Sequence, residues 1–231
     1  MVIFLHTDYD FPDPSRDDID ELLGVGGDLS PKRLLSAYSK GIFPWYSQDT
    51  PILWWSPDPR LIIEPRKLHV PKRLSRTIRK NLFKVSINMA FPQVINACAS
   101  VQRPGGQGTW IVPEMIHAYT KLHYLGYAHS VETWKDGELA GGLYGIAMGR
   151  AFFGESMFYY FTDASKVALV KLVQFLSSCG FEFIDCQQTT AHMMRFGAFE
   201  ISRKEFVRRL NLVLQEDILN IQSIWAPANI D

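Results

Sequence analysis

The chain has 231 residues, of which 47% are apolar, and it carries 24 basic and 24 acidic residues. This length fits one full domain with a small second one, and the balanced net charge by itself indicates no class of partner. Three cysteines without a CxxC pair argue against a disulfide scaffold and a zinc knuckle, and they fit a reducing cytosol. No stretch approaches the roughly 18 apolar residues of a membrane helix, and no signal peptide is recognisable, so we expect a soluble cytosolic protein.

The N-terminal quarter of the chain is rich in Pro, Gly, Trp and Asp, a composition typical of short elements joined by turns. Ser30 and Pro31 predict the N-cap and first residue of a helix, which Gly41 ends. Aromatic clusters follow on both sides of a polar turn. We therefore expect a small N-terminal domain over residues 1–62 and a larger domain over residues 63–231.

A strongly basic segment follows, because eight Lys and Arg residues and no acid lie between Arg66 and Lys84. Leu74, Ile78 and Leu82 recur every four residues and predict the apolar stripe of a helix. The basic residues that lie off this stripe are Arg73, Arg76, Arg79 and Lys80. Such a face is either solvated or binds a phosphate backbone, and the pattern leaves both open.

Helices are expected next over residues 91–99 and 113–125, separated by a glycine-rich loop over 103–108. The elements expected after them are strands at 128–134, 139–147 and 151–158, a helix capped by Asp163 or Ser165 and stopped at Gly180, a strand at 181–186, a short helix near His192 and a helix at 203–215. This order is that of an acetyltransferase core. The expected fold class is α+β, with a small N-terminal domain and a GNAT-type C-terminal domain whose mixed sheet is mostly antiparallel.

Polar residues stand at the end of the last buried strand, where they cost free energy unless something satisfies them. Strand alternation places Asp185 and Gln187 on one face, about 7 Å apart, and turns Cys186 away as a core thiol. A hydrogen bond between the two side chains would fix the amide of Gln187 and aim its oxygen at an incoming amine. The alternative is a strand-end pair that caps the next helix, and the pattern leaves both open.

A second polar group, Glu155, stands between aromatic residues. Gly154 predicts a β-bulge there, with the acid either in solvent or binding a cation or a sugar hydroxyl. The chain lacks GxxxxGK[ST], a GxGxxG that follows a strand, and GxSxG, so we expect no activation of a substrate by ATP.

Short motifs along residues 11–215 occur in an order that resembles the leucyl/phenylalanyl-tRNA–protein transferase family. They are GGDLS at 26–30, GIFPW at 41–45, WWSPDPR at 54–60, GTWI at 108–111, HSVE at 129–132, GGLYG at 141–145, GESMF at 154–158, ASK at 164–166 and IDCQ at 184–187. The resemblance implies an enzyme that moves Leu or Phe, and also Met, from Leu-tRNA or Phe-tRNA to proteins with an N-terminal Arg or Lys. The products are marked for degradation, and no cofactor or metal is implied.

The resemblance also implies roles for particular residues. Asp185 and Gln187 match the catalytic pair, Glu155 matches an acid near the aminoacyl-adenosine and the acceptor, and Trp45 matches a tryptophan that stacks on the terminal adenine. The residues matching the amino-acid pocket are Leu143, Phe152, Met157 and Ile184. The basic helix would then hold the acceptor stem through its phosphates.

Two other functions remain open beside this one. The first is an acetyltransferase-like module that grips RNA or a peptide without catalysis. The second is an acetyltransferase that uses coenzyme A, although residues 161–166 lack the Q/R-x-x-G-x-G/A loop expected there.

Overall fold

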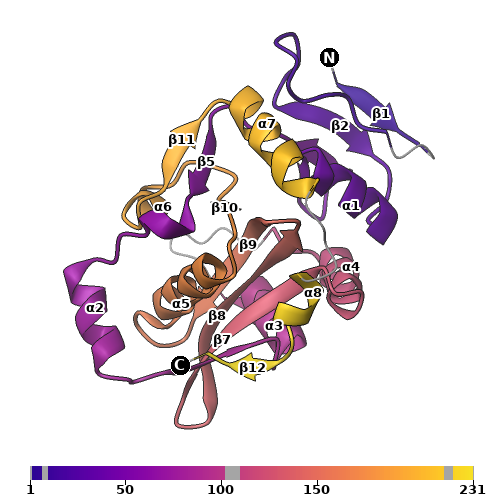
Figure 1. The fold of residues 1–231 in the computed structure, drawn as a ribbon. Coiled ribbons are helices and arrows are strands. Elements are labelled where there is room, and N and C mark those ends of the chain that lie inside the picture. Colours follow the sequence, from indigo (N-terminus) through magenta and orange to yellow (C-terminus); the bar gives the residue numbers. More distant parts are fainter. Residues whose placement is uncertain (1, 7–9, 102–109, 216–220, 231) are drawn as a thin grey trace.

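The computed structural model describes residues 2–6, 10–101, 110–215 and 221–230 (Figure 1). The glycine-rich loop expected over 103–108 lies outside the described residues. None of the described helices combines the length and the apolar surface needed to span a bilayer.

A small sheet forms the N-terminal part of the molecule. Its strand order is β1 (Ile3–Leu5), β2 (Leu22–Gly26), β4 (Leu53–Trp55) and β3 (Phe43–Pro44). Helix α1 (Pro31–Ser39) begins as predicted, because the Ser30 side chain accepts a hydrogen bond from the amide of Arg33. Gly41 follows the helix with φ of 74°, a conformation in which most side chains are strained.

A large mixed sheet forms the rest of the molecule. Its strand order is β11 (Phe199–Ile201), β5 (Arg60–Ile63), β10 (Phe183–Asp185), β9 (Ala151–Tyr159), β8 (Glu138–Met148), β7 (Ala128–Lys135), β6 (Lys84–Ile87) and β12 (Ala228–Asn229). Among the described strands of this sheet only β9 and β10 pair in parallel. The predicted mixed, mostly antiparallel sheet is confirmed.

Helices cover both faces of the large sheet. They are α2 (Lys72–Arg79), α3 (Phe91–Ser100), α4 (Pro113–Tyr124), α5 (Ala164–Ser178), α6 (Ala191–Met194), α7 (Arg203–Leu214) and α8 (Ile221–Ile224), with a 3₁₀ turn at Pro65–Lys67. Apolar residues of α5 pack against the strand residues that point to one face of the sheet. Apolar residues of α1, α3, α4 and α7 pack against the strand residues that point to the other face. Helix α5 connects the parallel strands β9 and β10, which need such a crossover.

The predicted helices of the larger domain are confirmed, with one correction in the basic segment. Helix α2 ends at Arg79 and Leu82 lies outside it, 50% exposed, so Leu82 is not part of the apolar stripe. The helix stops because Asn81 adopts φ of 49°, a left-handed conformation that asparagine tolerates. Strand β6, which the sequence did not predict, follows directly.

Two further details differ from the sequence interpretation. Asp163 does occupy the N-cap position of α5, but its carboxylate binds Lys166 Nζ at 2.7 Å and accepts from Thr77 Oγ1 at 3.3 Å instead of capping. Strand β5 was not predicted at all. It spans the expected domain boundary at residue 62, and that boundary remains a prediction.

Candidate active site

A β-bulge in β9 positions Glu155. Tyr144 pairs with Ser156 and Gly145 pairs with Gly154, so Glu155 is the extra residue in its strand. Gly145 is needed opposite this bulge, because a Cβ there would lie 2.2 Å from the carbonyl oxygen of Phe153. The predicted bulge is confirmed, but its acid does not point into solvent, because Glu155 is only 8% exposed.

The Glu155 carboxylate is half satisfied. Its Oε1 accepts hydrogen bonds from Tyr38 Oη at 2.6 Å and from Gln187 Nε2 at 2.9 Å, and the Tyr38 and Tyr119 hydroxyls lie 2.6 Å apart. Its Oε2 is buried and has no hydrogen-bond partner among the described residues. Burial raises the pKa of Glu155 to about 7, although the bond from Tyr38 acts in the opposite direction. Glu155 is therefore a buried acid with one unsatisfied oxygen, and its role near the substrates remains a prediction.

Another buried acid, Glu132 on β7, provides a contrast. Its carboxylate accepts from the Ser86 and Ser130 hydroxyls and from the amides of Met89 and Ala90 at the start of α3. A carboxylate with this many donors needs no ligand. Glu132 therefore serves to hold the start of α3.

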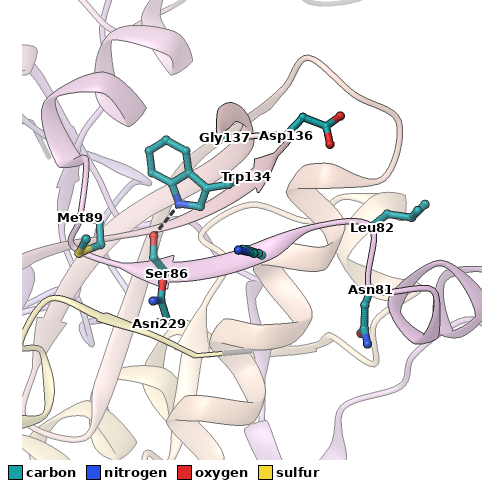
Figure 2. A pocket seen from close by; sticks show the side chains of 9 residues that line it. Asn81, Leu82, Ser86, Met89, Trp134, Asp136, Gly137 and Asn229 are labelled. Carbon is teal, nitrogen blue, oxygen red and sulfur yellow. Dashed lines mark hydrogen bonds between the residues drawn. The ribbon is translucent and has the colours of Figure 1, made fainter.

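A surface pocket of about 590 Å³ adjoins this network, and the Trp134 indole donates to the Ser86 hydroxyl in it at 2.8 Å (Figure 2). The residues that line it are Asn81, Leu82, Lys84, Ser86, Met89, Trp134, Asp136, Gly137 and Asn229. None of them has a predicted role in the reaction.

Asp185 ends β10 in a buried ion pair. Arg60 of β5 donates from Nε to Oδ1 at 2.8 Å and from Nη2 to Oδ2 at 2.6 Å, and the two side chains are 1% and 0% exposed. Asp185 Oδ1 also accepts the backbone N–H of Gln187 at 2.8 Å. The carboxylate is therefore bound on both oxygens.

Gln187 adopts a left-handed conformation with φ of 62°, which costs an ordinary residue about 1 kcal/mol. This conformation turns the Gln187 side chain away from the direction that strand alternation predicts. The prediction of a hydrogen bond between the side chains of Asp185 and Gln187 is wrong. Strand alternation ends at Asp185, so Asp185 binds the backbone of Gln187 while Glu155 binds its amide group. The amide oxygen has no hydrogen-bond partner within the described parts of the chain.

The alternative role of the pair as a helix cap finds no support. Helix α6 is capped by Thr190, whose hydroxyl accepts from the amide of Met193 at 3.2 Å. Cys186 is partly buried and packs against the apolar cluster on the α5 side, and burial raises the pKa of its thiol. Gln187 therefore has no capping role, and it is partly buried beside the exposed Gln188.

The four expected pocket residues form one patch on the α5 side of the sheet. Leu143 lies opposite Met157 across β8 and β9, and Phe152 lies opposite Ile184 across β9 and β10. Residues five apart normally face opposite sides of a strand, but the extra residue at Glu155 returns Met157 to the face of Phe152. The bulge that positions the acid thus also assembles the patch, whose role as the pocket remains a prediction.

Trp45 follows β3 and is 39% exposed. Its ring packs edge to face with Trp55, with centroids 6.0 Å apart, and the Trp55 indole donates to the Trp45 carbonyl at 2.8 Å. Trp45 therefore presents an accessible ring on a supported backbone, two residues after Phe43, whose ring contacts Arg60.

The basic residues of α2 are exposed as expected. Among the described residues, no carboxylate lies within ion-pair distance of the four basic side chains, which are Arg73, Arg76, Arg79 and Lys80. A groove of about 570 Å³, lined in part by Arg76 and Arg79, lies between α2 and α5. Unpaired charge beside a groove fits a ligand that carries phosphates.

Sequence reasoning missed several residues of the site. Arg60 binds Asp185, Tyr38 binds Glu155 and Tyr119 binds Tyr38, yet none of the three was given a role. The one available signal was Arg60 itself, a charge directly before the apolar run of β5. Such a charge needs a buried partner once the run enters a sheet.

The fold and the site together define a class of protein. A mostly antiparallel sheet extended by a βαβ crossover is a GNAT-like fold, and a buried carboxylate and a carboxamide lie where its parallel pair ends. A family model described as leucyl/phenylalanyl-tRNA protein transferase matches residues 62–211, and the model of its N-terminal domain matches residues 27–58. The chain belongs to the leucyl/phenylalanyl-tRNA–protein transferase family.

Curated relatives carry the name leucyl/phenylalanyl-tRNA–protein transferase. The protein from Anaeromyxobacter sp. (strain Fw109-5) is 57% identical over 220 residues, which cover 95% of this chain and 94% of that protein. The protein from Nitratidesulfovibrio vulgaris (strain DP4) is 58% identical over 201 residues, covering 87% of this chain and 86% of that protein.

Similar solved structures are far more distant. A GCN5-related N-acetyltransferase from Kribbella flavida matches 74% of this chain and 61% of its own with a TM-score of 0.40 and 12% identity. The L-PGS structure from Bacillus licheniformis matches 73% of this chain and 54% of its own with a TM-score of 0.39 and 11% identity. The chain thus spans less than two thirds of these two structures.

Proposed function

We propose that the chain performs the reaction of its family through Gln187, which orients the attacking amine. The protein is an aminoacyl-tRNA–protein transferase, with an aminoacyl-tRNA as donor and a protein as acceptor. The donors that we propose are Leu-tRNA and Phe-tRNA, and the acceptors are proteins that begin with Arg or Lys. Transfer would mark these proteins for degradation in the cytosol, where charged tRNA is made.

The supporting observation is that Gln187 is held at two points. Asp185 fixes its backbone and Glu155 fixes its Nε2, so its amide oxygen has a defined direction and can accept an N–H of the acceptor amine. The amine nitrogen then attacks the ester carbonyl, the C–N bond forms, the ester C–O bond breaks, and the amine proton leaves with the tRNA hydroxyl. Positioning of the reactants supplies most of the rate.

The chemistry makes no demand for ATP, because the ester is already activated and its conversion to an amide is downhill. An N-terminal amine has a pKa of about 7.7 to 8.0, so roughly a tenth of it is free at pH 7. A strong general base is therefore unnecessary. This agrees with Asp185, whose oxygens are both bound to Arg60.

The apolar patch would hold the side chain of the transferred amino acid. Its residues are Leu143, Phe152, Met157 and Ile184, which select by size and shape. Because one methylene is worth only about 1 to 3 kcal/mol, we expect Met to be accepted as well, and β-branched side chains to be disfavoured. The free Oε2 of Glu155 would accept a donor from the aminoacyl-adenosine or from the acceptor.

The direct test is a transfer assay without ATP. The protein is incubated with labelled Leu-tRNA and a peptide that begins with Arg, and incorporation into the peptide is expected. A binding module would retain both ligands without product. A coenzyme A-dependent acetyltransferase would instead label the peptide from acetyl-CoA, which is run as a parallel reaction.

Trp45→Ala should raise the KM for aminoacyl-tRNA, with a smaller loss of melting temperature because the ring also packs against Trp55. Stacking on a base is worth about 1 to 3 kcal/mol, so the expected increase is roughly 5- to 150-fold. Steady-state kinetics check this, with Trp45→Phe as the variant that keeps a ring. The exposed Tyr124→Ala serves as a control for loss of an aromatic residue, and an unchanged KM in Trp45→Ala would remove the stacking role.

Reversal of charge on α2 should weaken tRNA binding. With Arg73, Arg76 and Arg79 changed to Glu, we expect a higher dissociation constant and a flatter dependence on salt. Each phosphate contact that is lost should lower the slope of log Kd against log salt by about 0.7 to 0.9. Filter binding at several salt concentrations measures the slope, and Lys121→Glu on α4 is the matched control. An unchanged slope would mean that α2 is only a solvated face.

A further inference from the structure

The Arg60–Asp185 pair is too far from solvent to serve as a surface contact and has no free oxygen with which to bind a substrate. Both side chains are at most 1% exposed, and each carboxylate oxygen accepts one guanidinium nitrogen. Arg60 Nη1 has no hydrogen-bond partner among the described residues, so the two bonds to Asp185 are the hydrogen bonds that hold the guanidinium. A bidentate pair of this kind fixes orientation as well as charge.

Aromatic rings enclose the same guanidinium. Its central carbon lies 5.0 Å from the ring centroid of Phe43 and 4.5 Å from that of Phe206. Phe43 belongs to the small sheet, and Phe206 belongs to α7 near the C-terminus. Three separate parts of the chain therefore meet at this one group.

The ion pair is connected to Gln187 by short steps. Asp185 lies opposite Ile62 in the pairing of β10 with β5, and the next amide, that of Cys186, donates to the Leu61 carbonyl at 2.9 Å. The amide of Gln187 then turns back to Asp185 Oδ1. Because this bond holds Gln187 in its left-handed conformation, the direction of the Gln187 side chain depends on where Asp185 is held.

We infer that Arg60 is a positioning residue of the transfer reaction, which acts through Asp185 on the backbone of Gln187. This inference rests on the proposed role of Gln187. Arg60 touches no reacting atom. It anchors the carboxylate that anchors the turn, and the turn aims the amide oxygen at the amine.

The test separates this role from a contribution to folding. A buried ion pair can often be replaced by apolar residues of similar volume without loss of stability. The variant Arg60→Met with Asp185→Leu is therefore expected to melt near the temperature of the unchanged protein. It should bind aminoacyl-tRNA within twofold and transfer at least tenfold more slowly in a single turnover.

The decisive comparison repeats the paired change in a Gln187→Ala background. If Arg60 acts through Gln187, the paired change costs nothing further there. An equal loss of rate in both backgrounds, or a near-normal rate in the first, would overturn the inference. Should the paired variant not fold, the same cycle is run with Arg60→Lys, which keeps the charge and loses the fork. If Gln187→Ala alone keeps a normal rate, the proposed function of Gln187 fails instead.

Discussion

Replacement of Gln187 by Ala is expected to slow single-turnover transfer by about 10²-fold, the order of loss that a misplaced reactant causes. The dissociation constant for aminoacyl-tRNA should stay within twofold. The reason is that the Gln187 oxygen would meet the amine only as attack begins, whereas tRNA binding relies on other surfaces. Rapid-quench measurements with saturating protein report the chemical step, and filter binding reports the affinity.

The chain provides a matched control in the next residue. Gln188 is exposed, so Gln188→Ala should leave both the rate and the affinity unchanged. Asp185→Ala should also slow transfer, but it leaves Arg60 buried without a partner and should cost about 3 to 5 kcal/mol of stability. Near-normal rates in Gln187→Ala and in folded Asp185→Ala would reduce the pair to a structural role.

Glu155→Gln should remove a dependence of stability on pH that the unchanged protein shows. Burial raises the pKa of Glu155 from 4.5 to about 7, so the folded state binds this proton more tightly than the unfolded state does. Its stabilising contribution is complete below pH 4.5 and is lost as the pH rises through 7. A shift of this size is worth about 3 kcal/mol across that window.

The measurement is urea unfolding at intervals from pH 4.5 to 8. The difference in unfolding free energy between Glu155→Gln and the unchanged protein should move in favour of the variant as the pH rises. The exposed Glu138→Gln on β8 is the control and should track the unchanged protein. A difference that stays constant across the window would show that Glu155 does not titrate there.

Local signals were enough to predict most elements of the larger domain. The hairpin from β7 to β8 has an Asp-Gly turn, and helices α4 and α5 are each followed by a glycine with positive φ. Gly154 indicated the bulge in β9. Strand β5 was missed because it is short and its partners β10 and β11 lie more than a hundred residues further along the chain.

The site was predicted only in part, because its contacts cross long stretches of chain. The pattern left open whether Glu155 lies in solvent or binds a ligand, and Tyr38, 117 residues away, buries it. A polar residue at the end of a buried strand signals that Asp185 needs a partner, yet nothing near it names Arg60, 125 residues away. The left-handed residue of this turn is a glutamine, whereas glycine or asparagine would have signalled the turn in the sequence. Strand alternation was therefore extended too far, to Gln187.

The position of Arg60 has a consequence for where this chain can be divided. The two family models meet between residues 58 and 62, yet Arg60 is paired with Asp185, and Arg203 of α7 donates to the carbonyls of Ile19 and Ser56. If the chain were divided just after Arg60, that arginine and Asp185 would lie in different fragments, and each would lose its buried partner. The N-terminal lobe and the larger sheet of this chain are therefore held together by buried charged contacts as well as by the peptide link between them.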